Sequence, residues 1–383
     1  MRRIWGIFLA FFILLGIFPL TAYAAPTEVA AKSALLMDIA TGTVLYEQNA
    51  HTPLAPASVT KVMTMLLIME AIDDGRIGWQ DTVTASESAA AKGGSQIYLK
   101  VGETMSVEDM VKSIAVSSAN DCACAMAEHI AGSESTFVSM MNTRAQELGM
   151  ENTNFVNCTG LDDDPEAAKH LTSAYDIALM SRQLMLHHPD IKKYTTIWMD
   201  TVRSGSFGLS NTNKMVRFYP GSTGLKTGFT SAAGYCLSAT AQREGMELVA
   251  VVMGSATSKD RFAACKTLLD YGFANFATVQ PELPEQLTVP VKLGKQPSVT
   301  ALPRSTDALL VDKSQKNQVT TQYTLEESVT APVSRGQRLG TATVRVGDQV
   351  IAQIPLLAKD TVPRLSYGDV LLQLLKGMTM KGS

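Results

Sequence analysis

The sequence has few of the side chains that bind metals or nucleic acids. Only 5 histidines occur in 383 residues, and none of them forms an H-E-x-x-H pattern or stands beside the paired cysteines of a zinc site. The net charge is −3, which argues against a basic surface for nucleic acid. We therefore expect no metal, no cofactor and no nucleic-acid partner.

The cysteines are also few, and their number is odd. A count of 5 leaves at least one without an intramolecular partner in an exported chain. Cys122 and Cys124 lie two residues apart on a predicted helix and so point in different directions, and no framework spacing links Cys158, Cys236 and Cys265. We expect free, buried thiols that pack as small apolar side chains, and no histidine motif suggests a catalytic thiol.

Residues 1–24 have the features of a secretory signal peptide. Arg2 and Arg3 supply the positive charge, an apolar run follows, and Ala22 and Ala24 are the small residues before a cleavage site. The alternative is a permanent membrane anchor, but the short apolar run and the small-residue site favour cleavage. In either case, the rest of the chain is expected outside the cytoplasm.

The patterns of residues 25–276 indicate one α+β catalytic domain. Apolar periodicity predicts strands near both ends of this region and helices between them. This order predicts an antiparallel sheet with helices packed on it. The predicted strands cover 33–49, with a turn at Thr41-Gly42, and 223–230, 234–242 and 247–254, and the predicted helices cover 56–75, 106–132, 173–186 and 260–276.

Residues 277–362 change character and predict a small all-β domain. Prolines punctuate its start, LTVPVKL alternates apolar and polar residues, and Gly347-Asp348 is a hairpin turn signal. No cluster of side chains in this region suggests chemistry. Its role is left open by the sequence.

Residues 363–383 predict a terminal amphipathic helix. Leu371, Leu374, Leu375 and Met378 share one face. We expect this helix to lie on the outer face of the cytoplasmic membrane. The alternative is a helix docked on the β domain.

The stretch APASVTKVMTML places one lysine inside an apolar helix, with Ser58 three residues before Lys61. Positions i and i+3 share a helix face, so the hydroxyl and the amine can meet. Burial lowers the pKa of an amine, and a neutral amine can take the serine proton without any histidine. The S-x-x-K pattern is weak alone, because a lysine on a core helix can also extend to the surface.

Two further motifs follow in the chain. Ser118 and Asn120 lie in a predicted break between two helices, where a second hydroxyl can relay a proton and an amide can hold the substrate. Lys226, Thr227 and Gly228 lie on a predicted strand, where ammonium and hydroxyl can bind a carboxylate and glycine permits close backbone approach. Helix capping and a glycine-interrupted strand are the alternative interpretations of these tripeptides.

S-x-x-K, S-x-N and K-T-G in this order are the signature of β-lactamases and penicillin-binding proteins. With the longer stretches SALLMDIATGTVLYEQN, GLKTGFTSAAGYCLSATA and VAVVMGSATSKDRFAAC, the chain resembles the serine-type D-Ala-D-Ala carboxypeptidases, the low-molecular-mass penicillin-binding proteins of the peptidase S11 type. The resemblance covers essentially the whole mature chain. It implies the penicillin-binding-protein/β-lactamase-like fold, followed by the β domain and terminal helix.

The resemblance also implies the reaction and its residues. Ser58 would attack the penultimate D-Ala carbonyl of a peptidoglycan pentapeptide, Lys61 would be the base, and Ser118 would carry the proton to the leaving group. Peptide positioning would fall to Asn120. Carboxylate binding would fall to Lys226, Thr227 and Arg261, and the oxyanion would meet the N–H groups of Ser58 and Phe229, with Gly228 beside them. β-Lactams would acylate the same serine.

Two departures from the family pattern and several rival functions remain. Ala119 stands where the carboxypeptidases usually have Gly, and Phe229 stands where some members have His, which puts substrate preference and deacylation rate in doubt.

A β-lactamase would need an E-x-x-L-N segment, which is missing after the second motif. A non-catalytic cell-wall-binding protein would not need three intact motifs. The motifs do not distinguish a carboxypeptidase from an endopeptidase or a weak transpeptidase of the same fold.

Overall fold

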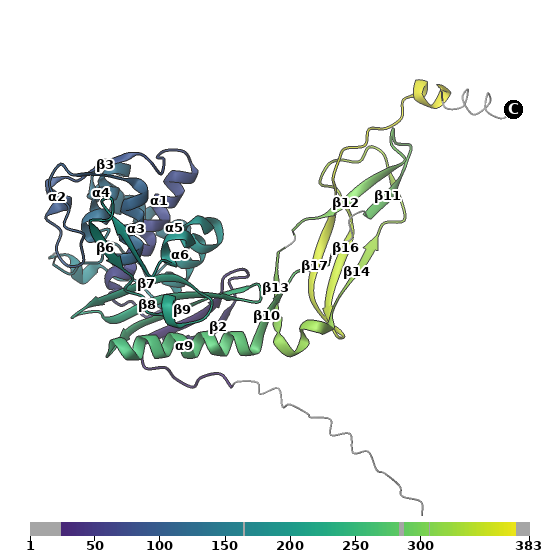
Figure 1. The fold of residues 1–383 in the computed structure, drawn as a ribbon. Coiled ribbons are helices and arrows are strands. Elements are labelled where there is room, and N and C mark those ends of the chain that lie inside the picture. Colours follow the sequence, from purple (N-terminus) through teal and green to yellow (C-terminus); the bar gives the residue numbers. More distant parts are fainter. Residues whose placement is uncertain (1–23, 164, 283–286, 306, 373–383) are drawn as a thin grey trace, which may run out of the picture.

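The computed structural model describes residues 24–163, 165–282, 287–305 and 307–372. The predicted signal peptide and the end of the predicted terminal helix lie outside these residues. A larger domain of helices and strands is followed by a slender β domain, as Figure 1 shows. Among the described residues, no helix combines the length and the apolar character that crossing a membrane requires.

A five-stranded sheet forms the centre of the larger domain. Its strands lie in the order β2-β1-β9-β8-β7, and every neighbouring pair is antiparallel. β7 is therefore an edge strand, with half of its backbone groups facing away from β8. The bounds are β1 Ser33–Asp38, β2 Val44–Gln48, β7 Ser222–Thr230, β8 Gly234–Arg243 and β9 Met246–Ser255.

Helices cover both faces of this sheet. α9, Ser258–Asn275, packs on β8 and β9 from one side, and α6, Ala174–His187, packs on β1 and β9 from the other. Helices α1, α3, α4 and α5 gather on the α6 side, as Figure 1 shows, whereas Met215 of α8 packs in the core beside α9. The bounds of the remaining helices are η1 Ala57–Thr60, α1 Lys61–Asp73, α2 Glu87–Ala90, α3 Val107–Ser117, α4 Asn120–Ala131, α5 Glu134–Glu147, η2 Ala167–Lys169, η3 Pro189–Ile191, α7 Lys192–Thr195 and α8 Met215–Phe218.

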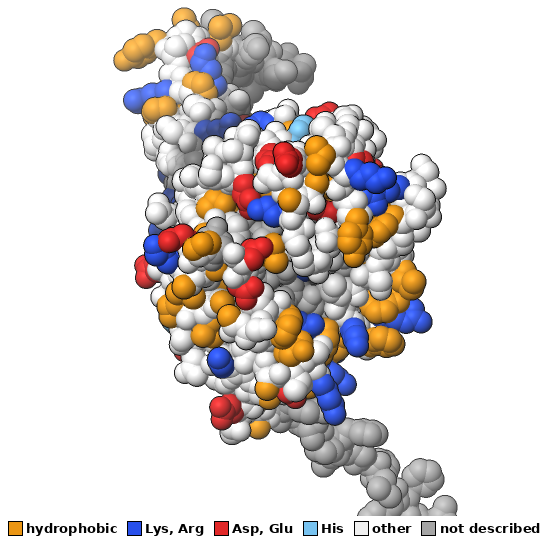
Figure 2. Space-filling view, turned by 90° about the vertical axis from the view of Figure 1, so that its left-hand side faces the viewer, with side chains coloured by type: hydrophobic (Ala, Val, Ile, Leu, Met, Phe, Trp, Pro, Cys, Tyr) orange, Lys and Arg blue, Asp and Glu red, His pale blue; other side chains and the backbone are white. Residues whose placement is uncertain are grey.

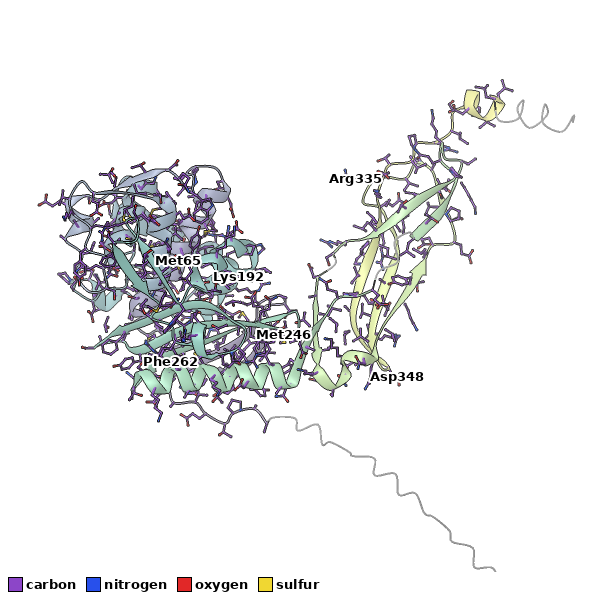
Figure 3. All side chains as sticks on the ribbon, viewed as in Figure 1. Met65, Lys192, Met246, Phe262, Arg335 and Asp348 are labelled. Atoms are coloured by element: carbon purple, nitrogen blue, oxygen red, sulfur yellow. The ribbon has the colours of Figure 1, made fainter. Side chains whose placement is uncertain are left out.

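The alternation of side chains along the strands produces two cores. On β1, Leu35 faces the α1 side of the sheet, whereas Leu36 faces α9. In Figure 3, Met65 of α1 and Phe262 of α9 lie on opposite sides of the sheet. α1 is apolar around its whole circumference because it is surrounded by the sheet and other helices, and ten of its 13 residues are buried.

The β domain is built on one six-stranded sheet. Its order is β14-β16-β17-β12-β11-β15, with only β11 and β15 parallel. A separate pair, β10 and β13, joins it to the end of α9 (Figure 1). The bounds are β10 Phe276–Val279, β11 Leu287–Lys292, β12 Ser298–Pro303, β13 Leu309–Asp312, η4 Lys313–Gln318, β14 Val319–Leu325, β15 Val329–Thr330, β16 Arg338–Val346 and β17 Gln349–Ala358.

These elements confirm the predicted α+β class with its antiparallel sheet and the all-β domain. The β1–β2 hairpin turns at Thr41-Gly42, and Ser106 caps α3 by accepting a hydrogen bond from Asp109 N at 3.1 Å. All five cysteines are free and buried, as predicted. The sequence analysis did not identify α5 or the two small hairpins β3–β4 and β5–β6, with bounds β3 Thr82–Thr84, β4 Thr104–Ser106, β5 Met199–Val202 and β6 Phe207–Ser210.

The predicted terminal helix is described only at its start. Residues 367–372 are helical, and Ser366 Oγ accepts a hydrogen bond from Asp369 N at 3.2 Å. The exposed fractions of Tyr367 and Leu371 are 98% and 60%. The face that carries Leu374, Leu375 and Met378 lies outside the described residues.

Candidate active site

The first motif places a serine and a lysine side by side. Ser58 lies in the 3-10 turn η1, and Lys61 is the first residue of α1. Lys61 Nζ is 3.0 Å from Ser58 Oγ and donates to Thr159 O at 2.7 Å. Lys61 is completely buried, whereas Ser58 is only partly buried. A substrate can therefore reach the hydroxyl while the amine stays in the protein interior.

Burial changes the acid–base behaviour of Lys61. Removal from water lowers the pKa of Lys61 from 10.5 to about 7, and the weaker effects of Cys158 and Asp121 oppose this shift only in part. A substantial fraction of the amine is then neutral near pH 7. A base is most effective when its pKa is close to the working pH.

The second motif lies at the junction of α3 and α4. Ser118 adopts a left-handed conformation with φ 64, which breaks the helix before Asn120 begins α4. Asn120 Nδ2 donates to Gly93 O at 2.7 Å. Both side chains are buried, and among the described residues neither Ser118 Oγ nor Asn120 Oδ1 has a hydrogen-bond partner. Unpaired buried polar atoms are costly, so they point to a site where a ligand supplies the missing bonds.

The third motif lies on the edge strand β7. Lys226 and Thr227 are buried, Lys226 Nζ donates to Thr227 O at 2.8 Å, and the hydroxyl of Thr227 lies 2.7 Å from that of Thr212. Burial lowers the pKa of Lys226 well below its usual value, and the charges of Lys61 and Arg261 lower it further. An anionic group bound here would relieve this concentration of positive charge.

Gly228 has a packing role that the sequence analysis did not predict. A Cβ atom at this position would lie 2.7 Å from Pro56 O and 3.0 Å from Ser58 N. The absence of a side chain therefore lets β7 pack directly against the turn that carries Ser58. The predicted approach of a substrate backbone at Gly228 stays a prediction.

Of the remaining two predicted residues, Phe229 lies on this strand and Arg261 lies beside it. Phe229 is half exposed, and its ring lies 4.3 Å from that of Tyr235. Arg261 is buried on α9, and its Nη1 donates to Gly228 O at 2.8 Å and to Cys236 O at 3.2 Å. Part of its hydrogen-bonding capacity thus holds β7 and β8 together, and among the described residues its Nε has no partner.

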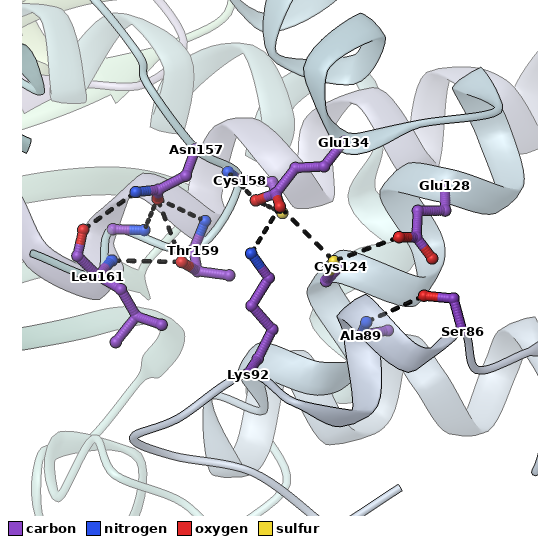
Figure 4. Close-up of polar contacts among 11 residues, drawn as sticks. Ser86, Ala89, Lys92, Cys124, Glu128, Glu134, Asn157, Cys158, Thr159 and Leu161 are labelled. Carbon is purple, nitrogen blue, oxygen red and sulfur yellow. Dashed lines mark hydrogen bonds and ion pairs between the residues drawn. The ribbon is translucent and has the colours of Figure 1, made fainter. Parts of the chain in front are cut away.

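A polar network surrounds Thr159, as Figure 4 shows, and the Thr159 carbonyl accepts the hydrogen bond from Lys61. Asn157 Oδ1 accepts from Gly160 N at 2.7 Å and from Thr159 N at 3.1 Å. Glu134 accepts from Cys158 N at 3.2 Å and from Lys92 Nζ at 2.6 Å. The loop before Leu161 is therefore tied to two other segments, which keeps the Thr159 carbonyl aimed at Lys61.

Sequence reasoning missed the residues that support the motifs. Thr159 contributes a backbone carbonyl, for which no side-chain pattern exists. Asp121 accepts backbone hydrogen bonds from Ile97 at 3.1 Å and Leu99 at 3.0 Å, and so fixes the loop opposite α4. In the sequence, the only indication of this supporting role was that Asp121 directly follows Asn120. Among the described residues, no group of three or more metal-binding side chains occurs.

His170 gives this region a pH dependence that can be measured. Burial, and then the charge of Lys61, lower the pKa of His170 from 6.5 to about 4. His170 therefore binds a proton more readily in the unfolded chain than in the folded one. The contribution of the neutral, buried His170 to the free energy of unfolding is complete above pH 6.5, and it is lost as the pH falls through about 4. A shift of this size corresponds to about 3 kcal/mol in the free energy of unfolding.

Urea unfolding at pH 7 and at pH 4.5 checks this expectation. Wild-type protein should lose more stability over this interval than His170→Gln, which has no such proton to bind. His129→Gln, which changes an exposed histidine, should behave like the wild type. Equal losses in wild type and His170→Gln would contradict the assignment.

The fold and this site define a serine hydrolase of the penicillin-binding type. The family model described as D-alanyl-D-alanine carboxypeptidase matches residues 20–257, and the one described as penicillin-binding protein 5, C-terminal domain, matches residues 283–364. The chain belongs to the D-alanyl-D-alanine carboxypeptidase family.

Relatives and solved structures agree with this membership. The chain is 43% identical to D-alanyl-D-alanine carboxypeptidase DacF of Bacillus subtilis over 88% of this chain and 87% of DacF. Penicillin binding protein 5 from Haemophilus influenzae superposes with a TM-score of 0.77 at 31% identity, covering 89% of this chain and 100% of that one. Penicillin-Binding Protein D2 from Listeria monocytogenes, solved in its cefotaxime-bound form, gives a TM-score of 0.60 at 32% identity over 65% and 99% of the two chains.

Proposed function

We propose that this enzyme removes the terminal D-alanine from peptidoglycan stem pentapeptides through an acyl-serine intermediate on Ser58. The observation that carries the proposal is the 3.0 Å approach of the buried Lys61 amine to the Ser58 hydroxyl. A lysine with a pKa of about 7 can activate a serine at neutral pH. Family membership supports the substrate class.

The proposed reaction has two halves. Neutral Lys61 takes the Ser58 proton as Oγ attacks the penultimate D-Ala carbonyl, and the oxyanion is held by the N–H groups of Ser58 and Phe229. Ser118 then gives its proton to the departing D-alanine amine and takes the proton held by Lys61, which breaks the peptide bond, leaves an ester on Ser58 and returns Lys61 to the neutral form. Water hydrolyses the ester and restores the free hydroxyl.

The remaining residues hold the substrate. Lys226, Thr227 and Arg261 are proposed to bind the terminal carboxylate, because a bound anion would favour the charged form of Lys226, whose pKa burial lowers, and Nε of Arg261 has no partner among the described residues. The unpaired Asn120 Oδ1 would accept from a substrate amide. β-Lactams are proposed to acylate Ser58 in the same position, which the cefotaxime-bound Listeria protein supports. Neither metal nor cofactor enters any step.

The location of the reaction is part of the proposal. Residues 1–24 would direct export, residues 25–276 would form the catalytic domain and 277–362 the β domain. Residues 363–383 would rest on the outer face of the cytoplasmic membrane, so that the enzyme works on the growing wall. Charges of both signs are interspersed on the face drawn in Figure 2.

The test uses protein lacking residues 1–24 and two substrates. We expect D-alanine release from diacetyl-Lys-D-Ala-D-Ala, and labelled penicillin on the peptide that contains Ser58 when the adduct is mapped by mass spectrometry. Cleavage of a D-Ala–diaminopimelate cross-linked dimer in place of D-alanine release would establish the endopeptidase. Hydrolysis of free penicillin at a high turnover would indicate a β-lactamase. A protein that labelled penicillin does not modify would indicate a non-catalytic cell-wall-binding protein.

A further inference from the structure

The residue before the nucleophile has an unusual backbone conformation. Ala57 has φ 48, in the left-handed region that residues with a Cβ atom rarely adopt. Such a conformation persists only where the surroundings enforce it, and it is most often found at functional sites. The neighbours of the Ala57 carbonyl show how it is enforced.

A directed chain of hydrogen bonds ends on that carbonyl. Thr60 Oγ1 donates to Ala57 O at 2.8 Å and lies 2.8 Å from His170 Nε2. Val156 N donates to His170 Nδ1 at 3.1 Å. Because Nδ1 accepts, the proton of the neutral ring is on Nε2, which donates to Thr60 and leaves the threonine hydrogen for Ala57. Thr60 and His170 are both buried, so water does not compete.

Gly160 closes the other side of the carbonyl. A Cβ atom at Gly160 would lie 1.9 Å from Ala57 O and 2.7 Å from Thr60 Oγ1. Gly160 has φ 81, so a side chain is disfavoured here by conformation as well as by space. The Ala57 carbonyl is therefore confined between a glycine backbone and a hydroxyl.

The direction of this carbonyl decides the direction of the next N–H group. The peptide bond between Ala57 and Ser58 is trans, so its C=O and N–H point in opposite directions. When Thr60 holds the carbonyl inward, the Ser58 N–H points the other way. On that side lies β7, whose Gly228 would place a Cβ atom 3.0 Å from Ser58 N.

We propose that Thr60 and His170 are positioning residues that hold the Ala57–Ser58 peptide so that the Ser58 N–H is aimed at the oxyanion. This inference rests on the proposed function, in which that N–H stabilises the tetrahedral intermediate. Neither side chain touches the substrate. Their effect is on the transition state, because the oxyanion forms only there.

The test compares matched threonine variants in the protein lacking residues 1–24. Thr60→Val removes the hydroxyl with little change in shape, and Thr60→Ser keeps it. Thr195→Val is the control, since Thr195 is equally buried on α7 and its hydroxyl also donates to a backbone carbonyl, Thr223 O at 2.7 Å. We expect Thr60→Val to lower penicillin acylation and the kcat for D-alanine release by about 100-fold, the effect of losing one oxyanion donor, with KM nearly unchanged.

The controls separate positioning from general stability. Thr60→Ser should acylate within about 3-fold of the wild type, and Thr195→Val should lower the Tm as Thr60→Val does without the 100-fold loss. His170→Phe should slow acylation by a smaller factor, and the Thr60→Val/His170→Phe double variant should be no slower than Thr60→Val, because both changes break one chain.

Three outcomes would overturn the inference. They are a Thr60→Val enzyme that acylates within 2-fold of the wild type, a Thr195→Val enzyme that is equally impaired, or strictly additive effects of Thr60 and His170. Failure of the wild type itself to form a Ser58 adduct would instead overturn the proposed function, and the positioning role with it.

Discussion

Ser58→Ala is expected to lower D-alanine release by about 10⁴- to 10⁶-fold and to eliminate the covalent penicillin adduct. Without the Oγ atom no acyl-enzyme can form, and the binding groups alone do not supply a nucleophile. The neighbouring Lys61 amine would remain buried, with Thr159 O as its hydrogen-bond partner. D-Alanine release and gel detection of labelled penicillin give the two readouts.

A matched control shows that the loss comes from chemistry rather than from removing any buried serine. Ser113 is completely buried on α3, and its hydroxyl donates to Asp109 O at 2.7 Å. Ser113→Ala should keep both activities, with at most a modest decrease in Tm. A penicillin adduct on Ser58→Ala at the wild-type level would show that another residue is the nucleophile.

Lys61→Arg is expected to lower acylation by about 10³-fold or more, because a guanidinium does not give up its proton near neutral pH. In the wild type the acylation rate should rise as the pH increases through about 7, where Lys61 becomes neutral. The variant should show a low rate that does not rise through this range. Stopped-flow acylation by a chromogenic β-lactam from pH 5 to 9 measures both.

A second substitution covers the case in which the larger arginine disturbs the buried site. Lys61→Met is uncharged and close in shape, so it should fold and also fail to acylate. Circular dichroism checks that both variants keep the α+β fold. Acylation of Lys61→Arg at the normal rate would show that Lys61 is not the base.

The catalytic motifs were predictable because each is local in the sequence. Ser58 and Lys61 are one helical turn apart, so their contact follows from helix geometry, and the break at Ser118 follows from the change of pattern before Asn120. The strand that carries Lys226 was predictable from its alternation and flanking turns. Their meeting in one site was inferred from motif order, and the structure shows the contact between β7 and η1.

Other features were out of reach because they depend on distant segments. α5 was missed, although it carries Glu134, which binds both Lys92 and the loop at Cys158. The packing of Gly228 against the turn at Pro56 was missed because the two segments are far apart in the sequence. The contact of Arg261 with the carbonyls of β7 and β8 likewise required the packing of α9 on the sheet.

By itself, the sequence determined the fold class, the order of the domains and the three motifs, since periodicity, capping and short spacings are local properties of a chain. Only the tertiary structure decided how deeply Lys61 is buried, and thus its pKa, because burial is the sum of contacts from many segments. It also decided that Thr60 and His170, 110 residues apart, share a hydrogen bond beneath the nucleophile. Such pairing leaves no periodic trace in a sequence, because its energy comes from the fold that brings the two side chains together.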